Sequence, residues 1–197
     1  MLLRQPTQDE IKTIQRKTAQ SIRTDWERYD QRFFVIVRSP EGGVSKGINV
    51  AVSEMKFDED KNPICGAVCC IAGRAAVIGV AMGLVARPVM GEEEWTWDHA
   101  LSMTNYDGIG DQNSVVGQHA WILLGLPQDT DGKFPDIFDQ HFHCLGRDEG
   151  DVEDSRYHRR LNAYRVARMI DEIADGRKDA TDRDVRCRPI ELPPETN

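Results

Sequence analysis

A stretch of twenty residues, 67–86, carries only one charged side chain, that of Arg74, and it constrains the fold more than any other feature. Twenty apolar residues are close to the length that a membrane-spanning helix needs. An arginine at the centre of such a helix, however, costs about 2.5–3.5 kcal/mol on insertion. The stretch has no belt of Trp or Tyr at its ends, and no second stretch of this kind occurs in the chain. We therefore predict that residues 67–86 form the central buried helix of a globular domain, and we expect no membrane partner.

Three further segments have the pattern of helices that bury one face. Thr7 and Glu10 have the spacing of a capping box at the start of the first helix, and Gly176 follows the last at the position of a C-terminal cap. Apolar residues recur at helical intervals between these signals. The predicted helices cover residues 7–28, 114–125 and 155–175. They predict a mainly α (α+β) fold, a single helical domain around one central apolar helix.

Residues 33–53 predict a small β-hairpin between two helices. β-Branched and aromatic residues fill 32–38, a Ser-Pro-Glu-Gly-Gly turn follows, and apolar residues alternate with period two over 47–53. Two strands alone are only marginally stable in water, so we expect an edge decoration or a projecting arm. The domain then spans residues 1–176 with the hairpin as an insertion, and residues 177–197 form a charged tail that we expect to be extended or poorly ordered.

Charge and cysteine content bear on compartment and partners. Lys and Arg number 25 and Asp and Glu number 33, which gives a formal net charge of −8 and disfavours nucleic acid as a partner. The five cysteines are an odd number with two of them adjacent, which is typical of a reducing compartment rather than of a disulfide framework. The sequence turns polar after three residues and has no secretory signal. We therefore expect a cytoplasmic protein, and the sequence does not indicate its oligomeric state.

The cysteines also admit a zinc site. On a helix, Cys65 and Cys69 would lie one turn apart on one face, and His141, His143 and Cys144 could complete a tetrahedral set of ligands. The paired short spacings typical of structural zinc are absent, however. Cysteine is also among the most buried residue types, so the favoured interpretation is that these thiols pack as small side chains. We expect no cofactor and keep the zinc site as the weak alternative.

A nucleophilic cysteine is a further alternative. At the N-terminus of a helix the dipole would favour the thiolate of Cys65, and His119 or His143 could act as the base. No sequence around Cys65 matches a known cysteine-enzyme signature. We therefore assign no catalytic residue, and a metal- or thiol-dependent enzyme centred on Cys65 and His143 stays the competing function.

Arg74 and two tryptophans are the candidate binding residues. A guanidinium inside an apolar helix must reach an acid, a cluster of carbonyls or solvent, because an unpaired buried charge is very costly. A salt bridge to an aspartate in 107–111 would meet this need, and an anion-binding pocket is the functional alternative. We expect Trp95 and Trp97 to be exposed, and tryptophan is enriched among the residues that carry binding energy in protein interfaces.

Basic residues on the last predicted helix admit two interpretations. They could touch phosphates, or they could pair within the chain with the acidic run 148–154 just before them, which we favour. The residues are Arg156, His158, Arg159, Arg160, Arg165 and Arg168.

Residues 65–75, with the sequence Cys-Gly-Ala-Val-Cys-Cys-Ile-Ala-Gly-Arg-Ala, resemble the marker Cys-Gly-Thr-x-x-Cys-Ile/Leu-Ala-Gly-x-Ala of a small family found in bacteria and their phages. Residues 26–34 and 120–126 resemble shorter segments of the same family. The chain departs from the marker at Ala67, where Thr is usual, and at Arg74, where His or Trp is common. The resemblance implies a small, mostly helical, cytosolic protein of bacterial or phage origin, and it implies no reaction.

The absence of a consistent catalytic set favours a non-enzymatic protein-interaction protein. Trp95, Trp97, the hairpin and the acidic run offer recognition surfaces. A phage or mobile-element factor that binds a host protein or a defence component would fit the size and acidity of the chain.

Overall fold

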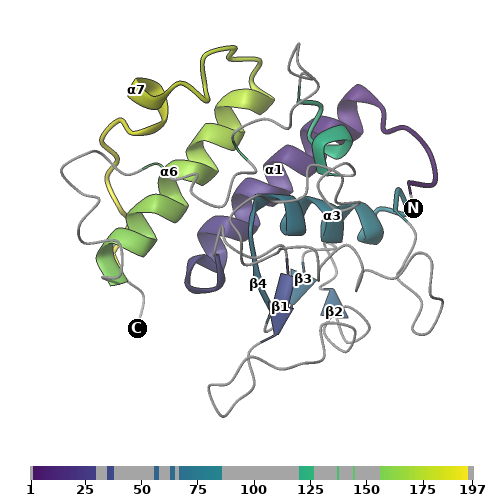
Figure 1. The fold of residues 1–197 in the computed structure, drawn as a ribbon, viewed down its shortest axis with the longest axis horizontal. Coiled ribbons are helices and arrows are strands. Elements are labelled where there is room, and N and C mark those ends of the chain that lie inside the picture. The colour runs from purple at the N-terminus through teal and green to yellow at the C-terminus, as the bar shows by residue number, and fades with distance from the viewer. Residues whose placement is uncertain are drawn as a thin grey trace, which may run out of the picture.

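The structure, a computed structural model, has a mainly helical fold in its described part (Figure 1). The described residues are 2–29, 35–37, 56–57, 63–64, 67–85, 120–126, 137, 144 and 156–194. Their elements, in chain order, are α1 (Gln8–Thr24), η1 (Trp26–Arg28), β1 (Val35–Val37), β2 (Lys56–Phe57), β3 (Pro63–Ile64), β4 (Ala67–Cys69), α3 (Ile71–Ala81), α6 (Arg156–Ala174) and α7 (Arg183–Arg186).

Helix α1 begins at the predicted capping box. The Glu10 carboxylate accepts the Thr7 N–H at 2.8 Å, and the Thr7 hydroxyl accepts the Glu10 N–H at 3.3 Å. Two of the N–H groups that a helix start leaves without partners are thereby bonded. The helix ends at Thr24, and a 3-10 turn, η1, takes the place of its predicted last turn.

Helix α3 confirms the predicted buried helix but not its bounds. It begins at Ile71, because residues 67–69 form strand β4 and Cys70 adopts the extended conformation of an N-cap. It ends at Ala81, and Gly83 reverses the chain with a φ of +69°, a conformation open to glycine at little cost. The predicted helix 67–86 is therefore wrong at both ends. At 11 residues α3 is also too short for a bilayer, and no described helix could cross a membrane.

Strand β1 pairs with β4 rather than within the predicted hairpin. The antiparallel register joins Val35 to Cys69 and Val37 to Ala67. Strands β2 and β3 form a second, separate antiparallel pair. The hairpin prediction is thus not supported: the first of its strands bonds to residues that we placed in the central helix, and its second segment, 47–53, lies outside the described residues.

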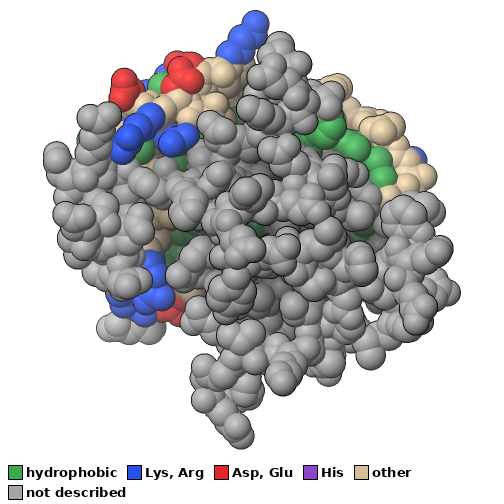
Figure 2. All heavy atoms as spheres, viewed as in Figure 1, with side chains coloured by type: hydrophobic (Ala, Val, Ile, Leu, Met, Phe, Trp, Pro, Cys, Tyr) green, Lys and Arg blue, Asp and Glu red, His purple; other side chains and the backbone are tan. Residues whose placement is uncertain are grey.

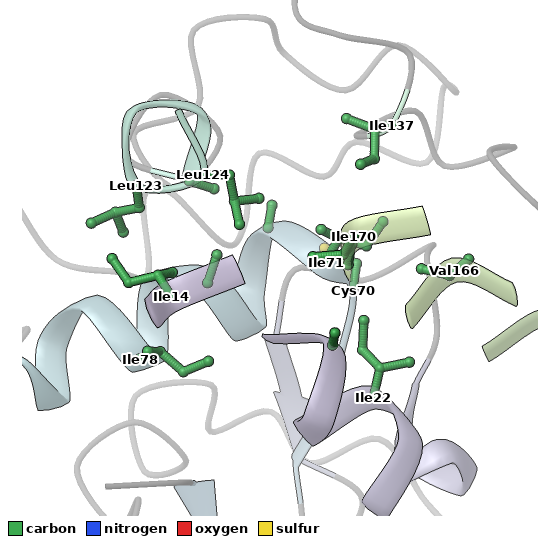
Figure 3. Packing of buried hydrophobic residues seen from close by; sticks show 14 of the residues in the cluster. Ile14, Ile22, Cys70, Ile71, Ile78, Leu123, Leu124, Ile137, Val166 and Ile170 are labelled. Carbon is green, nitrogen blue, oxygen red and sulfur yellow. The ribbon is translucent and has the colours of Figure 1, made fainter. Parts of the chain in front are cut away.

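The core lies where α3 meets α1, α6 and the short helical turn at 120–123 (Figures 1 and 3). Ile71 and Ile78 of α3 pack with Ile14 and Ile22 of α1, with Leu123, and with Val166 and Ile170 of α6 (Figure 3). Residues 71–79 of α3 are all buried, which confirms the prediction of a central helix. The turn at 120–123 lies within the predicted helix 114–125, whose earlier residues are not described.

Ion pairs join α1 to α6 at the edge of this core. Arg16 donates to Asp171 at 2.8 Å and also pairs with Asp175, while Arg23, about two turns further along α1, pairs with Asp171. These side chains keep contact with solvent, so each pair contributes little by itself, and the shared Asp171 makes them a network. In Figure 2, acidic and basic side chains lie beside one another at the upper left of the described surface.

The C-terminal segment packs against α6. The Arg168 guanidinium donates to the carbonyls of Val185, Arg186, Arg188 and Pro189 at 3.0–3.2 Å. Arg160 donates to the carbonyl of Pro193, and Ala180 is buried in the core. The predicted extended or poorly ordered tail therefore differs from the structure, in which residues 178–187 form turns and the short helix α7. Composition could not predict that the C-terminal segment packs against α6, because the acceptors of these hydrogen bonds are main-chain carbonyls, which are present in every sequence.

We expect Gly79→Leu to lower the free energy of unfolding by about 1–3 kcal/mol, because it overpacks the core. A Cβ atom at Gly79 would lie 2.6 Å from Cδ1 of Leu123 and 3.1 Å from Cγ2 of Val85. Chemical denaturation measures the loss. Leu123→Ala in the same chain removes the nearest obstacle, so the double variant should lose less than the sum of the two single losses. Wild-type stability of Gly79→Leu would contradict the close approach of these residues.

Glu10 should make the stability of α1 depend on pH. Bonds from the Arg4 side chain and from the Thr7 N–H lower the pKa of Glu10 from 4.5 to about 2. Since the folded pKa is the lower one, this stabilisation is complete above the ordinary carboxyl pKa and is lost as the pH falls toward 2. Glu10→Gln keeps an acceptor but does not titrate, so the wild-type advantage in denaturation should shrink between about pH 5 and 2. A constant difference over that range would refute the assignment.

Candidate functional site

The side chain of Arg74, in the first turn of α3, reaches the C-terminal end of α1. Its Nη1 donates to the carbonyl of Ser21 at 2.9 Å and to the Ser21 hydroxyl at 2.6 Å, and its Nη2 donates to the carbonyl of Asp25 at 3.0 Å. The residue is only 3% exposed. The last carbonyls of a helix carry partial negative charge, so a cation is favoured there. The two carbonyls also accept the N–H groups of Asp25 and Arg28, at 3.0 and 3.1 Å, so Arg74 is a second donor to each. Arg74 therefore acts as a cap on the end of α1.

The carboxylate of Asp25 is a secondary partner of this guanidinium. Its Oδ2 lies 3.8 Å from Nη2 of Arg74. Burial raises the pKa of the Asp25 carboxyl, and the charges of Arg74 and Arg28 oppose that rise without cancelling it. The carbonyls of Ser21 and Asp25 thus hold Arg74 more firmly than the carboxylate does. The aspartates at 107–111 that we considered as partners lie outside the described residues.

Cys70 has a structural role at the start of α3. Its sulfur accepts the Gly73 N–H at 3.4 Å, which makes it the N-cap of the helix. Burial raises the pKa of the Cys70 thiol to about 11, so the thiol is protonated at neutral pH. A protonated, buried thiol is a poor nucleophile, and in Cys70 it serves packing and capping.

The position of Cys69 and the start of α3 differ from those on which the metal and nucleophile hypotheses rest. Cys69 ends strand β4, and α3 begins only at Ile71, so the two cysteines are not one helical turn apart and Cys65 does not start this helix. Cys65, His119, His141 and His143 lie outside the described residues. Cys144 is buried, and burial raises the pKa of its thiol to about 12. Within the described parts of the chain, no group of three or more His, Cys, Asp or Glu residues is placed to hold a metal ion.

The arginines of α6 bind main-chain carbonyls. Arg165 donates to the carbonyl of Cys144 at 3.0 Å, and Arg160 and Arg168 bind the C-terminal segment. Both interpretations from the sequence, phosphate contacts and pairing with residues 148–154, therefore miss this role for these three residues. The acidic run itself lies outside the described residues. Only charge was visible in the sequence, and it does not reveal a carbonyl partner distant in the chain.

An exposed aromatic and basic surface lies at the start of α6. The Arg156 guanidinium carbon is 4.8 Å from the centroid of the Trp26 ring, and Arg156 also pairs with Glu27. Tyr157 is 59% exposed, although its helical spacing with Leu161 and Tyr164 is typical of a shared buried face. Arg159 is exposed three residues after Arg156 and so shares its face of the helix. We call Trp26, Glu27, Arg156, Tyr157 and Arg159 the Tyr157 surface.

The structure describes one of the three predicted binding residues. Arg74 is inside, bonded to the end of α1, while Trp95 and Trp97 lie outside the described residues. The Tyr157 surface was missed because Tyr157 has helical spacing with Leu161 and Tyr164, and spacing alone does not tell how far a buried face extends toward the end of a helix.

Comparisons of the chain with protein families, with curated proteins and with solved structures gave no match.

We expect Arg74→Leu to lower the free energy of unfolding by about 3 kcal/mol, because it removes the hydrogen bonds from the guanidinium to the carbonyls of Ser21 and Asp25 and to the Ser21 hydroxyl. Chemical denaturation measures this loss. Arg28→Leu is the matched control, since Arg28 is exposed and also contacts Asp25, at 3.3 Å; it should change stability by less than about 1 kcal/mol. Equal losses in the two variants would show that the carbonyl bonds of Arg74 do not hold α1 to α3.

Proposed function

We propose that this protein acts by binding another protein and has no catalytic activity, and that the Tyr157 surface is part of the interface. The observation that carries the proposal is the exposure of Tyr157, which is 59%. Its neighbours on the helix are Arg156, which pairs with Glu27, and the exposed Arg159. Tyrosine, tryptophan and arginine are the residue types enriched among those that dominate binding energy.

The order of this surface supports the proposal. Trp26 packs against the core, and Arg156 is held both by the Trp26 ring and by Glu27. The Tyr157 ring lies edge-on to the ring of His158, with centroids 5.3 Å apart. Side chains that are ordered before binding lose less conformational entropy when a partner docks. The surface is therefore suited to a rigid contact centred on one aromatic side chain.

The predicted binding residues Trp95 and Trp97 remain part of this proposal. We also propose, from the resemblance of residues 65–75 to the bacterial and phage family, that the chain is a phage or mobile-element factor. A host protein or a defence component would then be the partner, which fits a small acidic chain of 197 residues with a net charge of −8.

The competing function is a metal- or thiol-dependent enzyme centred on Cys65 and His143. Its helical premise fails, because α3 begins after Cys65. Metal analysis of the purified protein together with thiol titration separates the two functions. About one equivalent of zinc per chain, lost with the fold on chelation, would favour the enzyme, because structural zinc binding is itself folding free energy.

We expect Tyr157→Ala to weaken partner binding at least about tenfold, since an aromatic side chain at the centre of an interface typically contributes this much. Affinity capture from host lysate identifies the partner, and titration of the purified pair measures the loss. Leu3→Ala is the matched control, because Leu3 is also a large apolar residue and 55% exposed. Its binding should equal that of the wild type.

Two results would contradict the proposal. The first is a partner that binds Tyr157→Ala and the wild type equally. The second is that affinity capture retains no partner protein while the purified chain has an enzymatic activity that Cys65→Ala abolishes. Thermal unfolding of Tyr157→Ala and Cys65→Ala should be measured as well, so that a loss of binding or turnover can be distinguished from a loss of fold.

A further inference from the structure

Two cysteines far apart in the sequence are held at neighbouring positions of α6. The Arg165 side chain binds the carbonyl of Cys144 at 3.0 Å, and Arg168 binds the carbonyl of Arg186, the residue before Cys187, also at 3.0 Å. Arg165 and Arg168 are three residues apart, so they lie on one face of the helix, about 5–6 Å from each other. The two arginines thereby bring Cys144 and the chain at Cys187 to the same part of the molecule.

The electrostatics of Cys144 agree with this proximity. Burial is the main cause of its raised pKa, and the charge of Cys187 is the next contribution in the same direction. The charges of Arg186, Arg168 and Arg165 act in the opposite direction and lower this pKa. The neighbourhood therefore holds two thiols with several cations around them.

The two thiols differ in their access to solvent. Cys144 is fully buried, whereas Cys187 is partly exposed at the end of α7. Neither is in a disulfide in this structure. An oxidant from solution would meet Cys187 first, and the buried Cys144 would be the thiol that resolves the first product.

We propose that Cys144 and Cys187 are a modification site, a thiol pair that forms an intramolecular disulfide when the protein meets a small-molecule disulfide such as oxidised glutathione. This inference is independent of the proposed interaction function. The bond would close a covalent loop between the core at Cys144 and the C-terminal segment, to whose carbonyls Arg160 and Arg168 of α6 donate hydrogen bonds.

The reaction takes two exchange steps. The Cys187 thiolate attacks one sulfur of oxidised glutathione, which forms a mixed disulfide and releases one glutathione thiolate. The Cys144 thiolate then attacks the Cys187 sulfur, which forms the internal disulfide and releases the second glutathione. The two cysteines lose two electrons and two protons, and one oxidised glutathione becomes two reduced ones. Because burial keeps Cys144 protonated, the second step should be slow and should accelerate as the pH rises.

Peptide mapping of the full chain tests the proposal directly. Trypsin leaves Cys144 in residues 134–147 and Cys187 in residues 187–197, because Pro189 blocks cleavage after Arg188. The other three cysteines fall together in residues 62–74. The protein is incubated with oxidised glutathione, alkylated and digested. Mass spectrometry should then show peptide 134–147 linked to peptide 187–197. The undigested protein should migrate as a single chain on a denaturing gel without reductant, which shows that the disulfide is intramolecular. The melting temperature should rise on oxidation, because the cross-link restricts the unfolded chain.

Single variants separate this pair from general thiol oxidation. Cys187→Ser, a change at a partly exposed site, should abolish both the linked peptide and the rise in melting temperature. Cys144→Ser should leave Cys187 as a stable mixed disulfide with glutathione. Cys65→Ser is the control, because it keeps both thiols, and it should still give the linked peptide. Separate glutathionylated peptides in the wild type, or links from either cysteine to residues 62–74, would overturn the proposal.

Discussion

The contact between Arg74 and the end of α1 is the interaction on which the rest of the fold depends. Helix α3 is buried along residues 71–79, so the one charge inside it must be bonded within the protein. The carbonyls of Ser21 and Asp25 and the hydroxyl of Ser21 meet this need. One contact therefore gives a buried cation its acceptors and places a positive charge at the end of α1, where the helix dipole favours it. An arginine suits this position because its planar group presents several donors at once.

The placement of α1 in turn positions α6. The face of α1 that carries Arg16 and Arg23 meets Asp171 and Asp175, while Ile14 and Ile22 face the core. Helix α6 then holds the later parts of the chain through its arginines. The order of dependence runs from α3 through α1 to α6, and from α6 to the C-terminal segment and Cys144.

The sequence predicted those features of the fold that depend on residues close together in the chain. The capping box of α1, Gly176 after α6 and the apolar character of α3 each depend on residues close together in the chain, and the structure confirms all three. The pairing of Val35 with Cys69 depends on residues far apart, so periodicity could not reveal it. The start of α3 was missed for the same reason, since Ala67 to Cys69 are apolar in either state and the distant strand β1 makes them a strand. The same distinction holds for the candidate site. The sequence predicted that Arg74 needs hydrogen-bond acceptors, but it did not reveal that residues of the distant helix α1 provide them.

In the described part of the chain, buried or partly buried arginine side chains repeatedly donate hydrogen bonds to main-chain carbonyls. Arg74, Arg160, Arg165 and Arg168 each donate to main-chain carbonyls. Arg74 and Arg168 also have a carboxylate nearby, that of Asp25 at 3.8 Å and that of Glu172 at 3.9 Å. Three of the four are buried, which withdraws their charge from direct contact with solvent, whereas the chain has 33 acidic residues against 25 basic ones. The chain as a whole is acidic, with a formal net charge of −8. Against that background, Arg156 and Arg159 beside Tyr157 form a local basic feature, and an approaching partner with acidic side chains would be oriented toward it by charge before any contact is made.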